Sequence, residues 1–232
     1  MAIVSKVIAE SELSEKIVFK GGTAIHHCYL EQSRFSEDLD FSSLDKHLTL
    51  EEVQKTLSLQ PFLEVRRTHK SKATIKIENL RYTGVLDQPN YLKVEVDFIQ
   101  NVVLPAKKLP YNNAWDIKAI VHVMDIKEIC SEKIRAMSDR ARYRDFYDWF
   151  LINQQYSFNP VEIYDLMQQK ETRKIISKES ILRNWGIAKE AKQRERTEVY
   201  YRNKVADHDE WIEKALKKLS FKPIPINSLF HK

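Results

Sequence analysis

The stretch Lys20–Asp40, KGGTAIHHCYLEQSRFSEDLD, decides the fold of this chain. It follows the short apolar run Ile17-Val18-Phe19, which is typical of a buried strand. Gly21-Gly22 ends that strand in a turn, and a short helix is predicted over Thr23–Gln32. A second strand is predicted over Glu37–Phe41. The stretch therefore predicts a strand, a glycine turn, a helix and a strand that carries two carboxylates.

Two features of this stretch suit a phosphate and its metal ion. A glycine pair lets the backbone approach a ligand closely, and the start of a helix offers N–H groups to phosphate oxygens. Asp38 and Asp40 alternate with Leu39 and Phe41, so the two carboxylates share one strand face, as Mg²⁺ ligands would. Separately, a Gly-Gly turn is usually only a turn, and Asp-x-Asp is often a solvated strand edge. Their combination, with one helix between them, favours the functional interpretation.

These residues carry a family resemblance. Lys20-Gly21-Gly22-Thr23-Ala24, followed by Arg34-Phe35-Ser36-Glu37-Asp38-Leu39-Asp40, resembles the signature of the AbiEii/AbiGii toxin family, MenT-like toxins among them. Members have the nucleotidyltransferase fold. The resemblance implies that Asp38 and Asp40 hold Mg²⁺ or Mn²⁺ and that a nucleoside triphosphate (NTP) binds beside them. The nucleotide-binding residues that it implies are Lys20, Gly21, Gly22, Thr23, Arg34 and Ser36.

A third carboxylate would complete such a metal site, and the strand predicted over Tyr91–Gln100 offers two. Its apolar face carries Val94, Val96 and Phe98, and its polar face carries Lys93, Glu95 and Asp97. The resemblance favours Asp97 as the third metal ligand, with Glu95 as the alternative. An ordinary half-exposed strand shows the same alternation, so the pattern leaves both interpretations open.

A second signature includes a lysine inside an apolar helix stripe. Lys133 lies in that stripe, where a lysine either snorkels to the helix edge or faces an interior cleft. Glu132-Lys133-Ile134-Arg135-Ala136 and Arg144-Asp145-Phe146-Tyr147-Asp148 resemble the family's lysine helix and its Arg-Asp-x-x-Asp motif. Asp145 can orient Lys133, accept a proton or hold a metal indirectly, and a structural ion-pair network is the alternative. The implied catalytic residues are Asp38, Asp40, Lys133 and Asp145.

Composition places the chain among globular proteins. Of its 232 residues, 43% are hydrophobic and 31% charged, and only four are glycine, which argues against a turn-rich all-β fold. Cys28 and Cys130 form no metal-ligand spacing and imply no disulfide framework, which fits a reducing cytoplasm. The first sixteen residues mix charges with apolar residues, and no run reaches membrane length, so we expect a cytoplasmic protein.

The remaining pattern predicts an α+β fold with two domains. Residues 1–124 are expected to form a nucleotidyltransferase-fold mixed sheet with flanking helices, and residues 125–232 a helical domain that completes the active-site cleft. In the first domain we predict helices Ile3–Lys16 and Thr49–Leu59, strands Phe62–Thr68, Ala73–Tyr82, Tyr91–Gln100 and Ile117–Met124, and an irregular segment Asn101–Asp116. In the second we predict helices over 125–139, from Pro160 onward, and over Ser177–Trp185, Lys189–Asn203 and Asp207–Leu219.

The net charge of +5 is concentrated in residues 170–204. This segment holds eleven Lys and Arg residues against five Glu, interleaved with Trp185, Tyr200 and Tyr201. Such a segment suits an RNA backbone and its bases, and a solvated helical face explains the charge equally well. On the first interpretation the acceptor-binding surface includes Lys189, Lys192 and Arg194.

The motifs together predict metal-dependent transfer of a nucleoside monophosphate from an NTP to an acceptor hydroxyl. The resemblance implies an RNA acceptor, the 3′ end of a tRNA, and a toxin of a toxin–antitoxin or phage-defence system with a separate winged-helix antitoxin. Two alternatives stay open: a catalytically silent nucleotide- or RNA-binding module, and transfer to a protein hydroxyl. The motifs contact only the triphosphate and the metal, so they do not specify the acceptor or the NTP.

Overall fold

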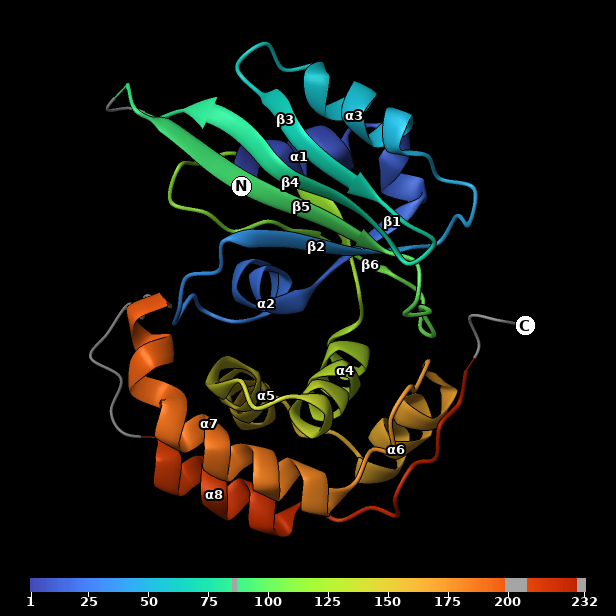
Figure 1. Cartoon of the computed structure of the whole chain (residues 1–232), viewed down its shortest axis with the longest axis vertical. Helices are drawn as coiled ribbons and strands as arrows, with labels where there is room; N and C mark the ends of the chain where they lie inside the picture. Colours follow the sequence, from blue (N-terminus) through green and yellow to red (C-terminus); the bar gives the residue numbers. More distant parts are fainter. Residues whose placement is uncertain (85–86, 199–207, 229–232) are drawn as a thin grey trace. The chain divides into compact units, whose positions relative to one another are not determined.

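The computed structural model describes residues 1–84, 87–198 and 208–228, with the side chains of residues 193–198 outside the description (Figure 1). Two compact units share the chain. The first comprises Met1–Tyr29 and Ser36–Asp125, and the second comprises Leu30–Phe35 and Ile126–Lys232. The fold class is α+β, as predicted, because a mixed sheet forms the first unit and helices form the second.

The first unit is built on a sheet of seven strands in the order β3-β4-β5-β2-β1-β7-β6. The strands are β1 (Ile17–Lys20), β2 (Asp38–Ser43), β3 (Glu64–Lys70), β4 (Thr74–Thr83), β5 (Pro89–Asp97), β6 (Lys107–Pro110) and β7 (Ile120–Val123). The three strands predicted between Phe62 and Gln100 are β3, β4 and β5, and they form an antiparallel meander. In contrast, β2 pairs in parallel with β5 and β1 in parallel with β7. The strand that carries the two aspartates therefore lies inside the sheet, between β1 and β5.

The sheet has one apolar and one polar face at β2 and β5. Leu39 and Phe41 of β2 are buried, as are Val94 and Val96 of β5. Helices α1 (Ala2–Ala9) and α3 (Leu50–Ser58) lie together on one face (Figure 1). Residues of α1 line a small cavity with Phe19 and Phe41, so this helix covers the apolar face. The residues that alternate with these, including Asp38 and Asp40, consequently point to the opposite face.

Two predicted helices of this unit are shorter than expected. The entry helix stops at Ala9 and is followed by a 3-10 turn, Glu12–Glu15, because the Ser11 hydroxyl accepts from the Leu13 N–H and caps a new start. The helix predicted over Thr23–Gln32 is a single α-turn, α2 (Gly21–Ala24), which continues as the π-helix Ile25–Tyr29. Tertiary contacts hold the wider turn, since the buried His27 ring stacks on Tyr111 with 4.4 Å between centroids.

Of two further predictions for the first unit, one is confirmed and the other is wrong in part. Thr49 followed by Glu52 three residues later predicts a capping box at the start of α3, and it is confirmed, because each side chain is bonded to the other residue's backbone. Hydrogen bonds from Lys16 and Thr49 lower the pKa of Glu52 to about 2. The prediction of an irregular Asn101–Asp116 is wrong in part, because β6 lies within it and pairs along β7 at the sheet edge, where Pro110 is tolerated.

The second unit is helical. Its helices are α4 (Ile126–Asp139), α5 (Tyr143–Gln155), α6 (Pro160–Gln169), α7 (Lys178–Glu198) and α8 (Asp209–Lys218). α4 contacts α5, α6 and α7, and α7 lies beside α8 (Figure 1). Asn159 before Pro160 predicts a helix start, and the Asn159 side chain does cap α6 by accepting from the Val161 N–H.

The two helices predicted within residues 177–203 are one continuous helix through residue 198. Gly186 lies between the two predicted ranges, but Trp185 and Ala188 on either side are buried and carry the helix across it. Trp185 packs on Tyr143 and Phe146, with ring centroids 5.8 and 5.2 Å away. None of the helices in the described ranges has the length and apolar composition needed to cross a membrane.

Candidate active site

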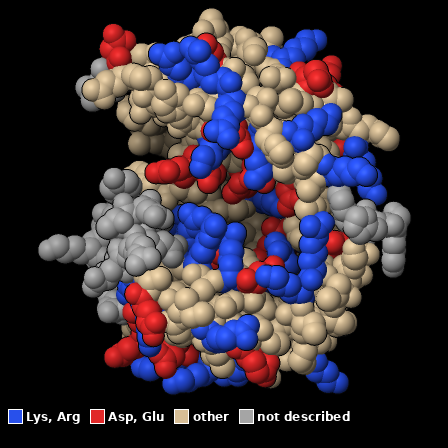
Figure 2. Space-filling model, viewed as in Figure 1, with Lys and Arg blue, Asp and Glu red and all other residues tan. Residues whose placement is uncertain are grey.

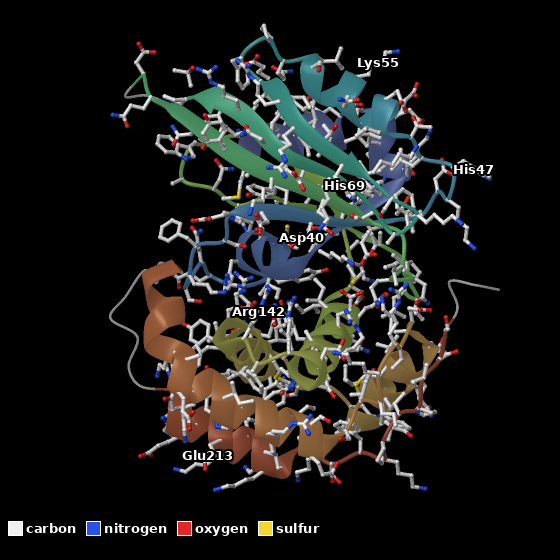
Figure 3. The ribbon with its side chains drawn as sticks, in the orientation of Figure 1. Asp40, His47, Lys55, His69, Arg142 and Glu213 are labelled. Carbon is white, nitrogen blue, oxygen red and sulfur yellow. The ribbon has the colours of Figure 1, made fainter. Side chains whose placement is uncertain are left out.

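The candidate site of the sheet unit joins β2 to the glycine turn. Asp38 and Asp40 are both partly exposed on the polar face of β2, and Asp40 lies beside α2 (Figure 3). The Thr23 hydroxyl donates a 2.5 Å hydrogen bond to the backbone carbonyl of Asp38. This bond ties the start of α2 to the start of β2. Ser36, predicted to bind nucleotide, lies partly exposed in the irregular segment that leads into β2.

Gly21 is required at its position for two reasons. Its φ of +78° lies in the left-handed region that side chains disfavour. A Cβ at Gly21 would also lie 2.7 Å from Oδ2 of Asp40 and 3.2 Å from its Cβ. The glycine turn therefore approaches the carboxylate of Asp40 closely, which brings together the two parts of the sequence motif.

Gly21→Ala is expected to lower transfer activity on the order of 10²-fold, because the new methyl displaces the Asp40 carboxylate. The left-handed backbone should also cost about 1–2 kcal/mol of unfolding free energy. Gly186→Ala is the matched control. A Cβ there meets no described atom within 4 Å, so this helical site should gain about 0.5–1 kcal/mol with activity unchanged. Thermal melting and a transfer assay measure both; equal effects at the two glycines would contradict the assignment.

Asp97, the predicted third metal ligand, is held by other partners. Its Oδ2 lies 2.9 Å from Nζ of Lys20, a residue that is 8% exposed. Its Oδ1 accepts from the backbone N–H groups of Ile99 at 2.7 Å and Gln100 at 3.3 Å. Lys20, predicted to bind nucleotide, is thus the counter-ion of Asp97.

The alternative third acid, Glu95, is also paired. Its Oε1 lies 3.1 Å from Nζ of Lys76 and 3.1 Å from the hydroxyl of Thr74, both on β4. Within the described ranges, no group of three or more His, Cys, Asp or Glu side chains is placed to hold a metal. The predicted three-carboxylate centre is therefore not assembled. Asp38 and Asp40 still fit a divalent cation, since they offer carboxylate oxygens on one face, and Gly21 carries no side chain that would displace the Asp40 carboxylate.

The helical unit holds a candidate site of its own, an ion cluster. Lys133 of α4 is 8% exposed, and its Nζ lies 2.9 Å from Oδ1 of Asp145 and 2.7 Å from Oδ2 of Asp148. Both aspartates belong to α5 and are buried. Lys133 faces the interior of its unit, so the snorkelling interpretation is wrong.

Arg34 belongs to the same cluster. Its Nε and Nη2 donate to the two carboxylate oxygens of Asp148 at 2.7 and 2.6 Å, and the Arg34 side chain is 3% exposed. The guanidinium of Arg34 is therefore engaged by Asp148, and nucleotide binding by Arg34 stays a prediction. Sequence reasoning missed that Asp148 joins Arg34 to Lys133, although its position one turn after Asp145 placed both aspartates on one helix side.

Asp145 is also bound by a second cation. Nε of Arg140 lies 2.8 Å from Oδ2 of Asp145, and the Arg140 side chain is half exposed. Burial alone would raise the pKa of Asp145, but the charges of Lys133 and Arg140 outweigh it and hold that pKa well below its usual range. Arg142 follows at the N-terminal end of α5 (Figure 3). Asp145 is consequently ionised at neutral pH.

The basic segment 170–204 is only partly a surface. Lys170 is buried between Glu128 and Glu132, at 2.6 and 2.8 Å. Lys192 is buried, bonds Asp209 at 2.7 Å and lies 4.8 Å above the Tyr143 ring. These lysines and Trp185 stabilise the helical unit, so their assignment to an RNA surface was wrong. The side chain of Arg194 and residues 200 and 201 lie outside the described part. Figure 2 shows Lys and Arg mixed with Asp and Glu over the visible face.

Comparison with known proteins decides the family. The model of the nucleotidyl transferase AbiEii toxin family, of type IV toxin–antitoxin systems, matches residues 2–217. The chain belongs to this family. No match was found among curated proteins. Among solved structures, MenT4, a nucleotidyltransferase toxin from Mycobacterium tuberculosis H37Rv, shares 20% identity and a TM-score of 0.59 over 90% of this chain and 68% of its own.

The resemblance read from the two signatures is thus confirmed, and with it the fold. The AbiEii chain is a nucleotidyltransferase and the toxin of a type IV system. An enzyme of this class takes an NTP and generally uses divalent metal ions, and a toxin of this type implies an antitoxin.

Proposed function

We propose that this AbiEii toxin transfers a nucleoside monophosphate from an NTP to the 3′ hydroxyl of an RNA, with a tRNA as the acceptor and Mg²⁺ or Mn²⁺ as the metal ion. The observation that carries the proposal is the close approach of Gly21 to the Asp40 carboxylate. A backbone turn that approaches a carboxylate pair offers N–H donors and metal ligands within one unit. Both are needed to bind a triphosphate.

The residues of the first unit are assigned to the metal and the phosphates. Asp38 and Asp40 would hold the divalent ion, which neutralises phosphate charge and lowers the pKa of the attacking hydroxyl. The backbone N–H groups of Gly22 and Thr23 are assigned to phosphate oxygens. The hydrogen bond from Thr23 to the Asp38 carbonyl supports this assignment, because it fixes the turn relative to the carboxylates.

Lys133 is assigned to the charge that develops on the phosphates in the transition state. Asp145 and Asp148 both contact its ammonium group, so the position of this charge is fixed before substrate binds. The lowered pKa of Asp145 makes it a poor proton acceptor. Of the three roles open to Asp145, orienting Lys133 is therefore the one that we assign.

The partners follow from the chemistry and the family. NTP and tRNA are both found in the cytoplasm, which we propose as the compartment. We further propose that the antitoxin is a separate winged-helix protein.

The test incubates the purified protein with each labelled NTP, Mg²⁺ or Mn²⁺, and either total tRNA or cell protein. We expect label at RNA 3′ ends, with one NTP preferred, and none with Asp40→Asn. Label on cell protein instead of RNA would mean that the acceptor is a protein hydroxyl. Absence of label in every combination would mean that the chain binds nucleotide without catalysing transfer.

A further inference from the structure

Lys20 places a positive charge on the same sheet face as the aspartate pair. It stands opposite Asp40 in the antiparallel β1–β2 ladder, and residues opposite each other point to one side. Only 8% of Lys20 is exposed, so its charge is expensive to bury without a partner. Asp97 supplies that partner at 2.9 Å.

Asp97 is arranged to hold an ammonium. One carboxylate oxygen contacts Lys20, and the other accepts two backbone N–H groups just beyond the end of β5. The two amides fix the orientation of the carboxylate whether or not Lys20 is present. In the parallel β2–β5 ladder Asp97 stands opposite Ser42, while Asp40 stands opposite Glu95. Asp97 is thus on the correct face for a metal ligand, but its Oδ2 atom, which accepts neither backbone N–H group, contacts Lys20.

We propose that Lys20 is a cation built into the site, that Asp97 is the positioning residue that holds it, and that Asp38 and Asp40 bind a single divalent ion. This inference rests on the proposed metal role of Asp38 and Asp40. The ammonium reduces the repulsion between the two carboxylates when metal is absent. It also supplies a fixed positive charge to the phosphates, in the place where other enzymes use a second ion.

The experiment measures Mn²⁺ binding to the full chain by electron paramagnetic resonance, without nucleotide. Wild type should bind one ion, and Asp40→Asn should bind none. Lys20→Met frees Asp97 to become a third ligand, so Mn²⁺ affinity should rise about tenfold. Lys20→Met/Asp97→Asn removes both charges and should return close to wild-type affinity. If Asp97 were already a ligand, the double variant would instead bind as weakly as Asp97→Asn alone.

Lys93→Met is the charge-matched control. Lys93 is exposed and stands opposite Asp38 in the β2–β5 ladder, so its loss removes the same charge from the same face without freeing Asp97. We expect its Mn²⁺ affinity to stay within about twofold of wild type, as for a screened surface charge. Circular dichroism and thermal melting check that each variant is folded.

The outcomes separate this inference from the proposed function. An unchanged affinity in Lys20→Met, two ions in wild type, or an Asp97→Asn loss as large as that of Asp40→Asn would each overturn the inference alone. No Mn²⁺ binding in wild type up to millimolar concentration would overturn the metal role of Asp38 and Asp40, and the inference with it.

Discussion

Asp40→Asn is expected to abolish nucleotidyl transfer while the protein stays folded. The side chain lies on the polar face of β2, where Gly21 approaches it, and contributes nothing to the apolar core. Losing one of two metal-binding carboxylates should remove several kcal/mol of transition-state stabilisation, on the order of a 10³-fold loss in rate. Without metal the variant should melt at or slightly above the wild-type temperature, because one of two like charges on that face is gone.

The measurement is transfer to RNA, with melting recorded with and without Mg²⁺. Asp38→Asn should behave in the same way, and Mg²⁺ should raise the melting temperature of wild type only. Glu64→Gln is a matched control, since it neutralises an exposed acid of the same sheet on the edge strand β3. If both aspartate variants keep transfer activity in Mg²⁺, the metal role of this pair is wrong.

Lys133→Met is expected to lower turnover 10²–10³-fold, as for the loss of one preorganised charge. It should also destabilise the protein. The substitution leaves Asp145 and Asp148 buried without the ammonium between them, and breaking such a pair costs about 3 kcal/mol. Arg140 and Arg34 remain as partners, which keeps the cost at the lower end of the usual range. Denaturant unfolding and single-turnover transfer measure the two effects.

The pH dependence of unfolding tests the same cluster. The pKa of Asp145 is lowered in the folded protein, so its contribution is fully present above the unfolded value near about 4 and is lost as the pH falls toward the folded value. The stability difference between wild type and Lys133→Met should therefore narrow below about pH 4. Lys127 is on α4 like Lys133 and makes an exposed ion pair with Glu162 of α6. Lys127→Met should therefore change stability by less than about 1 kcal/mol at any pH. A constant difference for Lys133→Met would contradict the lowered pKa.

The sequence could predict those features that depend on neighbouring residues. The period of two in β2 placed Asp38 and Asp40 on one face, and Asn159-Pro160 marked the start of α6. The π-helix after α2 could not be predicted, because it depends on the packing of His27 against Tyr111, eighty-odd residues away. The continuity of α7 through Gly186 depends on the burial of Trp185 against α5. Tertiary contacts decide both.

In the candidate sites, too, the features set by neighbouring residues could be predicted and those set by tertiary contacts could not. Motif positions singled out Asp38, Asp40, Lys133 and Asp145 and offered Asp145 as a partner of Lys133, but they did not predict the ion pairs of Lys20 and Arg34. The pairing of Lys20 with Asp97 joins residues 77 positions apart, and that of Arg34 with Asp148 joins residues 114 apart. The local sequence pattern predicts which face of a strand or helix a side chain lies on. The counter-ion of a buried charge depends on which distant segments the fold brings together.

The short segment Leu30–Phe35 makes the two units inseparable as fragments. It interrupts the sheet unit in sequence but belongs to the helical one. A fragment cut at residue 125 would retain Arg34 and expose a guanidinium that has lost Asp148. The complementary fragment would retain Asp148 with Lys133 but without its bidentate partner. Neither piece is a portable module, so gene fusions, domain exchanges and split-protein reconstitution with this toxin have to keep the hexapeptide together with α5.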